Sequence, residues 1–350
     1  MSSDDFSRGP AQSAILSKIA KLEQEAVARR RGKASDESSC SSSSNIEHDE
    51  ELSSDVSVLR KAPGHDAQPD FFIPTLYDVG TKDSRGIMDV AVFRLSKKDK
   101  RPQSIIRYDL PDGHVEVSSG IHGMASVWDY DIVLMAISHL TESMNRFREG
   151  KGAKPGPEFR PHVSDVLKFC RRDNGGKQKD AIVGALERLS TTHVSIERTK
   201  KVKNKTLVIN EGENLIGPYR TVTNKDTGKL ESVEIRIADW MYREITEGKN
   251  PDVLTVHPNY FLIEPGIGRF LYRLARKAAG KTSATWGFKT IYDRSGSTGT
   301  MKEFCRILRG IISKNDLPEY SLKEEQGKDG PMLVMTNLAY TAEATEKAEP

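Results

Sequence analysis

Two stretches of this sequence carry the same order of predicted elements, in which three helices are followed by strands that form a hairpin. Apolar residues at helical spacing predict the helices at 126–150, 161–173, 175–192, 266–280, 283–297 and 298–315. Alternating apolar residues predict the strands within 193–239 and 319–337. This order is typical of the winged helix, a variant of the helix-turn-helix, so its repetition predicts an α+β fold with two tandem winged-helix domains.

The remaining segments suggest where these domains begin and end. The first winged-helix domain is expected over 70–250, with extra N-terminal strands at 87–96 and 104–120, and the second over 251–340. A disordered tail is expected at 341–350.

The N-terminal part has a different character. Residues 1–69 form a Ser- and acid-rich arm with few apolar anchors, which predicts disorder. Within this arm, apolar residues at helical spacing in 14–32 predict a short helix, whose function is either to bind a partner or none at all.

Charge is distributed unevenly along the chain, although the formal net charge is only +3. Residues 258–314 carry 11 Lys/Arg and three acids, whereas 1–61 and 315–350 are net acidic. A solvated basic face would explain this block, but its concentration favours a polyanionic partner.

Several classes of protein are disfavoured by the sequence. The three cysteines, Cys40, Cys170 and Cys305, form no C-x-x-C pair, which argues against a zinc ribbon or a disulfide framework. No apolar run has the length of a membrane span. We therefore expect a protein of the cytoplasm, without a metal or other cofactor.

The tripeptide Gly280-Lys281-Thr282 matches the end of a phosphate-binding loop. Such a loop needs a strand before it and a helix after it, but the residues before Gly280 predict an amphipathic helix. Gly280 is therefore predicted to end that helix. Because the eight histidines also provide no metal-binding His-x-His pair, we expect no catalytic activity.

The last predicted helix of the second stretch has the pattern of a DNA-recognition helix. Its apolar residues share one side, which leaves Lys302, Arg306 and Arg309 on the other, with Thr300 near its start. Because an arginine can contact guanine through two hydrogen bonds, Arg306 or Arg309 is the predicted base contact. A solvated charged face is the alternative.

Further basic residues are predicted to contact the DNA backbone. In the first stretch, Lys177 and Lys179 open the third helix, and Arg188 lies further along it. The predicted hairpin after this helix has a basic tip, a wing that would contact phosphates through Lys200, Lys201, Lys203 and Lys205. In the second stretch, the cations predicted to clamp the DNA backbone, called backbone clamps below, are Arg269, Arg273, Arg276, Lys281 and Lys289.

Three segments together resemble a known family. They are "VFRLSKKDKR", "GMASVWDYDIVLMAISHL" and "FLYRLARKAAGKTSATWGFKTIYDRSGSTGTMKEFCRILRGI". In order and spacing they resemble the replication initiator protein A family of bacterial plasmids, over roughly residues 85–340.

This resemblance implies a function and a set of partners. It implies an initiator that recognises direct repeats in double-stranded plasmid origin DNA, helps to open an adjacent A+T-rich region and recruits a host initiator and the replicative helicase. It also implies control of its own gene, and hence of plasmid copy number. Single-stranded DNA binding and a homodimer are further expectations. A winged-helix transcriptional repressor that binds an operator is the alternative function.

Overall fold

The computed structural model describes residues 57–63, 79–173, 176–202, 205–228, 230–248 and 251–340, with the side chains of 176–179 and 200–202 left out. The described residues belong to one compact unit, 52–350. The predicted helix at 14–32, the Ser-rich stretch and the tail at 341–350 lie outside the described residues. The predicted domain boundary at 250 stays a prediction.

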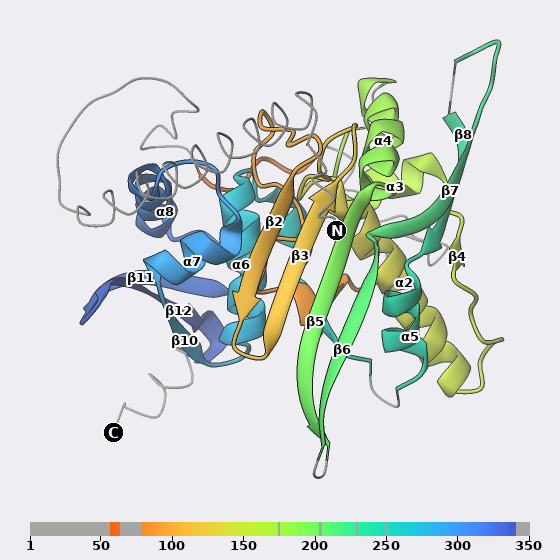
Figure 1. Cartoon of the computed structure of the whole chain (residues 1–350). Coiled ribbons are helices and arrows are strands. Elements are labelled where there is room, and N and C mark those ends of the chain that lie inside the picture. The colour runs from red at the N-terminus through yellow and green to blue at the C-terminus, as the bar shows by residue number, and fades with distance from the viewer. Residues whose placement is uncertain are drawn as a thin grey trace, which may run out of the picture. The chain divides into compact units, whose positions relative to one another are not determined.

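A first set of helices and strands occupies the middle of the chain (Figure 1). Its elements are α2 (Tyr130–Arg148), β4 (Glu158–Phe159), α3 (Val163–Phe169), α4 (Gly176–Leu189), β7 (Ile216–Thr223) and β8 (Leu230–Ile237). The three strands form an antiparallel sheet in the order β4-β8-β7. The short strand between the first two helices therefore pairs with the second strand of the β7–β8 hairpin.

A second set near the C-terminus has the same order. Its elements are α6 (Gly266–Ala278), β10 (Ser283–Gly287), α7 (Phe288–Ser295), α8 (Met301–Lys314), β11 (Tyr320–Gly327) and β12 (Gly330–Asn337). The strands are again antiparallel, in the order β10-β12-β11. The prediction of a shorter helix or turn of helix in 283–297 is confirmed only for α7, because residues 283–287 instead form the strand β10, which pairs with β12.

A separate four-stranded antiparallel sheet contains β2 (Ile105–Leu110), β3 (Gly113–Ser119), β5 (Thr192–Val202) and β6 (Lys205–Asn214), in the order β2-β3-β5-β6. We expected the basic-tipped hairpin, now β5–β6, to be the wing of the first set. That placement was wrong, since β5 pairs with β3, and β7–β8 is the hairpin that pairs with β4. Val117 pairs with Val194 across β3 and β5, and both side chains are buried, which explains this choice of partner.

Short elements complete the fold. They are β1 (Lys82–Ser84), the 3₁₀ helix η2 (Arg85–Ile87), α5 (Asp239–Thr246), β9 (Val253–Thr255) and the 3₁₀ helix η3 (Pro258–Leu262). β1 and β9 pair as a two-stranded antiparallel sheet. In the described part of the chain, no helix has the length and apolar character that crossing a membrane requires.

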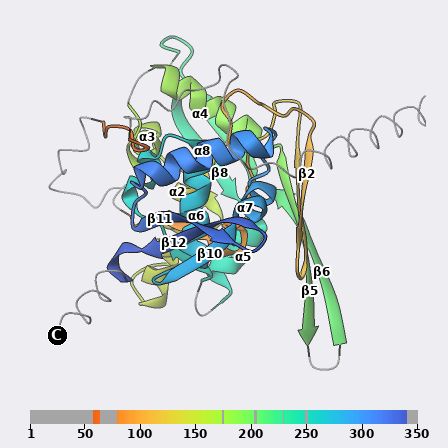
Figure 2. The same ribbon diagram turned by 90° about the vertical axis from the view of Figure 1, so that its left-hand side faces the viewer.

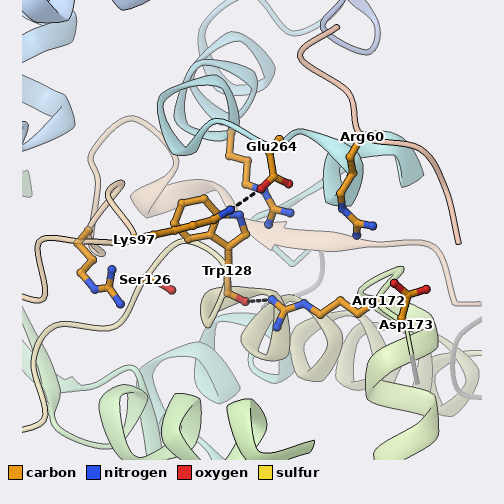
Figure 3. Close-up of a pocket in the computed structure, with 9 residues that line it drawn as sticks. Arg60, Lys97, Ser126, Trp128, Arg172, Asp173 and Glu264 are labelled. Atoms are coloured by element: carbon orange, nitrogen blue, oxygen red, sulfur yellow. Dashed lines mark hydrogen bonds and ion pairs between the residues drawn. The ribbon is translucent and has the colours of Figure 1, made fainter. Parts of the chain in front are cut away.

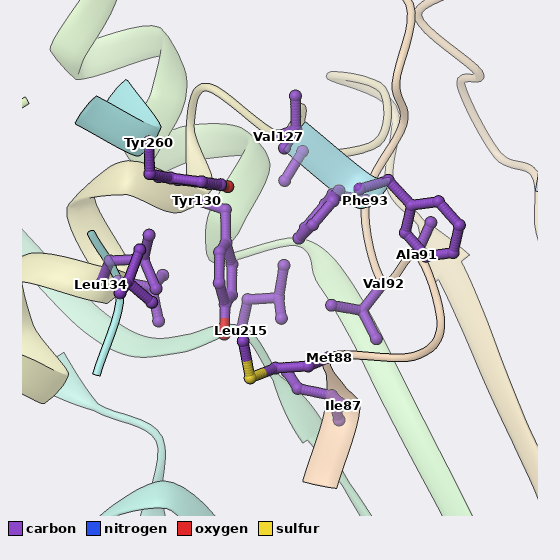
Figure 4. Close-up of a cluster of buried hydrophobic side chains, with 14 of the residues drawn as sticks. Ile87, Met88, Ala91, Val92, Phe93, Val127, Tyr130, Leu134, Leu215 and Tyr260 are labelled. Carbon is purple, nitrogen blue, oxygen red and sulfur yellow. The ribbon is translucent and has the colours of Figure 1, made fainter. Parts of the chain in front are cut away.

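The segment 87–96, predicted to be a strand, has no regular strand structure apart from an isolated bridge between Arg94 and Ser126. Consecutive residues such as Val92 and Phe93 are completely buried, instead of alternating between a buried and an exposed face. The segment lies in the main hydrophobic cluster, together with Tyr130 and Leu134 of α2 (Figure 4). Its apolar residues therefore fill the core as an irregular chain.

Candidate DNA interface

Helix α8 is positioned by its cap and by its apolar side. The Thr300 hydroxyl accepts a hydrogen bond from the backbone N–H of Glu303 at 3.2 Å, which caps the helix as its first residues require. Phe304 and Leu308 are buried, and the ring of Phe304 lies 5.3 Å from that of Tyr292 on α7, edge to face. The helix is therefore fixed from one side, and Figure 2 shows it at the surface that faces the viewer.

The opposite side of α8 carries the predicted DNA-contacting cations. Lys302, Arg306 and Arg309 are exposed. Arg306 donates to both carboxylate oxygens of Glu303, at 2.9 and 2.7 Å, and this bond raises its pKa. Arg309 donates to the carboxylate of Glu324 on β11, at 2.8 to 3.2 Å. These partly exposed carboxylates reduce the positive charge of the face, but ion pairs at a protein surface contribute little stability and can exchange partners at low cost.

The β5–β6 hairpin carries the predicted backbone-contacting lysines at its far end (Figures 1 and 2). Strand β3 pairs with β5 only as far as Arg198, so the residues beyond it pair only between β5 and β6. Lys200 and Lys201 lie in β5, Lys205 begins β6 with an exposed side chain, and Lys203 lies outside the described residues. The hairpin thus holds its basic tip away from the helices that precede it.

Helix α4 holds the remaining predicted contacts of the first set. Lys177 and Lys179 lie in its first turn. Arg188, near its end, donates from Nε and Nη2 to the two carboxylate oxygens of Asp129, at 2.8 and 2.9 Å. The Arg188 side chain is only 24% exposed, and this pair attaches α4 to the start of α2. Arg188 therefore has a structural partner, and its contact with DNA stays a prediction.

Helix α6 ends at the tripeptide that resembles a phosphate-binding loop. Gly280 follows the helix in the left-handed conformation, with φ of 57°, and the strand β10 comes next. The prediction that this match is a helix terminus is confirmed. Lys281 and Lys289 are exposed, whereas Arg276 donates to the backbone oxygen of Thr255 at 2.7 Å.

Two of the predicted backbone clamps were wrong. Arg269 is 2% exposed and Arg273 is not exposed at all, so neither is the exposed surface cation that the sequence predicted. Arg269 donates to both carboxylate oxygens of Asp131, at 2.7 and 2.9 Å, and Arg273 donates to Asp83 at 2.6 Å. Buried arginines need such partners, and the acids that pair with them come from distant parts of the sequence.

The sequence did not reveal a basic pocket of about 460 Å³ (Figure 3). Five cations line it, contributed by segments that the fold brings together: Arg60, Arg94, Lys97, Arg172 and Arg269. Its remaining lining includes Trp128, just before α2, and Glu264, just before α6. Only the cluster "SKKDK" at 96–100 carried a signal that could have pointed to it, since the other cations are scattered through the sequence.

Within the described ranges of 57–340, no group of three His, Cys, Asp or Glu side chains is arranged to hold a metal ion.

Comparisons with known proteins cover a large part of this chain. A curated relative from Wigglesworthia glossinidia brevipalpis, named "Putative replication protein", is 29% identical over 245 residues, which are 69% of this chain and 84% of the relative. Two solved structures of domains 2 and 3 of RctB align with a TM-score of 0.48 and 10% identity. They cover 73% of this chain and 98% and 97% of the solved chains. The model of the family described as "Replication initiator protein A" matches residues 82–322, and the chain belongs to this family.

Proposed function

We propose that this protein is a sequence-specific DNA-binding initiator of plasmid replication. It recognises repeats at the origin, promotes the opening of adjacent A+T-rich DNA and recruits host replication proteins. Membership of the replication initiator protein A family supports the general role. The arrangement of α8 and of the β5–β6 hairpin supports base contacts by the helix and phosphate contacts by the hairpin.

We further propose that both sets of elements are winged-helix units. Each set has a helix, a short strand, two more helices and a hairpin, and the short strand pairs with the second hairpin strand. In a helix-turn-helix unit the last helix of the bundle enters the major groove. The corresponding helices here are α4 and α8, and the first unit carries the β5–β6 hairpin as an insertion between α4 and β7.

The observation that carries the proposal is the division of α8 into two faces. Phe304 and Leu308 hold its inner face in the core, and Lys302, Arg306 and Arg309 are exposed on the other. A helix fixed from behind with long donors in front suits base contacts in a major groove. Binding would replace the carboxylates of Glu303 and Glu324 by phosphate oxygens or guanine.

The β5–β6 hairpin has a different part in the proposal. Lysines at the end of a ribbon supply charge without the planar two-donor geometry of arginine. Contacts with phosphates would therefore add affinity for any DNA sequence and depend on salt. We propose no catalytic step for either surface.

Footprinting of the whole protein on the DNA around its own gene tests the proposal. The titration is repeated across a salt series with competitor DNA, because backbone contacts weaken as salt rises and base contacts preserve specificity. Protection of several regularly spaced direct repeats is the expected result. A single inverted site over the promoter would favour a repressor, and the absence of any protected site would overturn the proposal.

A further inference from the structure

The basic pocket lies where five separate segments meet (Figure 3). Arg60 comes from the N-terminal segment 57–63, whose Arg60 backbone N–H donates to the backbone oxygen of Leu262 in η3 at 2.8 Å. Trp128 precedes α2, Arg172 follows α3, and Glu264 precedes α6. The pocket therefore lies between the starts of the first helices of the two sets, and helix N-termini favour anions.

The lining has an excess of positive charge. Five cations face two carboxylates, those of Asp173 and Glu264. Arg269 and Arg172 both donate to Asp131, which lies beneath the lining. Even if this third carboxylate is counted, the cations outnumber the acids.

Two of these cations have no carboxylate partner in the described part of the chain. Arg94 is 6% exposed, and it donates only to backbone oxygens, among them that of Met124 at 3.0 Å. Arg60 donates only through Nη2, again to backbone oxygens, so its Nε and Nη1 donate to no described residue. Arg94 is buried and Arg60 is half-buried, and charges withdrawn from water ordinarily have a counter-charge, so these two arginines favour an anion in the pocket.

The closeness of several arginines to one another also favours an anion in the pocket. Burial lowers the pKa of Arg60, and the neighbouring Arg269 lowers it further. Burial also lowers the pKa of Arg94, with Arg188 adding to the effect and Asp129 opposing it. An anion in the pocket would offset both the repulsion between the arginines and the cost of withdrawing their charges from water.

Trp128 adds a flat aromatic surface to the lining. Its indole Nε1 is buried without a hydrogen-bond partner among the described residues. The ammonium group of Lys97 lies 4.9 Å from the centre of the ring and is also paired with Glu264. Both partners of that pair are about half exposed, so Lys97 can transfer its interaction to an incoming anion.

We propose that this pocket is a binding site for a phosphate-bearing anion. Arginine and lysine suit phosphate oxygens, the volume of about 460 Å³ is that of a small-ligand site, and five cations line it. The phosphate belongs either to a free molecule, such as a nucleotide, or to the DNA backbone. The site is distinct from the α8 face, so it does not depend on base recognition there.

Calorimetric titration of the whole protein tests this proposal, with sodium pyrophosphate, ATP and a random-sequence DNA duplex as the probes. The variant of the site combines Arg60→Gln with Lys97→Met, which removes two charges and retains the aliphatic part of each side chain. The matched control combines Arg107→Gln with Lys151→Met, whose side chains are 52% and 68% exposed and line no part of the pocket. Thermal melting of all three proteins establishes that they are folded.

The expected result is that the pocket variant binds pyrophosphate or ATP at least about tenfold more weakly, because the loss of one charge-assisted bond to phosphate already has an effect of that size. Unchanged DNA affinity would identify a free phosphate ligand. Weaker DNA binding, with pyrophosphate competing against DNA in the wild type only, would identify the DNA backbone. If the wild type binds no probe beyond the effect of sodium chloride at equal ionic strength, or if the control loses as much as the pocket variant, the proposal is overturned.

Discussion

Arg273 on α6 donates from Nε to Oδ2 of Asp83 at 2.6 Å, and neither side chain has any exposed surface. The hydroxyl of Tyr130 donates to the other Asp83 oxygen at 3.0 Å. The guanidinium carbon of Arg273 lies 4.8 Å from the ring centre of Phe93 and 5.0 Å from that of Tyr130. Burial opposes the charge of Arg273, but Asp83 raises its pKa and keeps it protonated.

Replacement of Arg273 by methionine should lower the free energy of unfolding by about 3–5 kcal/mol, because it leaves the Asp83 carboxylate buried without a counter-charge. Urea unfolding measures the loss. The double variant Arg273→Met/Asp83→Asn should recover much of it, since no buried charge then remains.

The matched control is Arg107→Met, which breaks an exposed pair with Asp109 and should cost less than about 1 kcal/mol. An equal cost for Arg273→Met and Arg107→Met would show that the buried pair does not stabilise the fold.

On α8, replacement of Arg306 or Arg309 by alanine should weaken binding to the cognate DNA site by about 1–3 kcal/mol and relax its base preference. Competition binding against single-base variants of the site measures both effects. Glu324→Gln should instead strengthen binding, because it removes the carboxylate that competes for Arg309. Wild-type base preference in both arginine variants would exclude α8 as the recognition helix.

At the tip of the β5–β6 hairpin, Lys205→Gln should weaken binding to all DNA sequences alike. The slope of log affinity against log salt should fall by about one, as expected for the loss of one phosphate contact. Binding isotherms at several salt concentrations, on cognate and random duplexes, give this slope. A loss confined to the cognate duplex would contradict the proposed division between the hairpin and α8.

The pH dependence of the free energy of unfolding should show the titration of the Glu244 carboxyl on α5. Burial raises its pKa from 4.5 to about 7, although the hydroxyl of Ser84 donates to it at 3.0 Å and opposes the shift. The folded state therefore holds this proton more tightly than the unfolded state does. The contribution to stability is complete below about pH 4.5 and decreases by about 3 kcal/mol as pH rises to about 7.

Urea unfolding between pH 4 and pH 8 measures this decrease, and Glu244→Gln should flatten the profile over that interval. An unchanged slope in the variant would assign the pH dependence to other groups.

Local patterns predicted the helices well. The apolar spacing that defines α8 is visible in the sequence, and so is the glycine that follows α6, because both depend on residues within a few positions of each other. The exposure of Arg306 and Arg309 follows from the same spacing. One of their ion-pair partners could also be predicted from the sequence, since Glu303 lies within one helical turn of Arg306.

Long-range pairing could not be predicted in the same way. No residue near Arg269 or Arg273 in the sequence indicates that these arginines pair with Asp131 and Asp83. Both arginines therefore resembled surface cations, although they lie in the core. The β5–β6 hairpin was recognised as a hairpin but assigned to the wrong sheet, because its partner β3 is more than 70 residues away. The basic pocket forms only where five distant segments of the chain come together, so it could be found only in the folded structure.

The attachment of α6 has a consequence for the spacing of sites on DNA. Arg269 and Arg273 lie one helical turn apart, and their buried pairs fasten α6 to α2 and β1. We expect these buried pairs to limit motion between the two sets, so that in the proposed complex α4 and α8 would contact the duplex at a fixed interval. Insertion of about 5 base pairs between the two contact sites would turn one site to the opposite side of the DNA and should weaken binding.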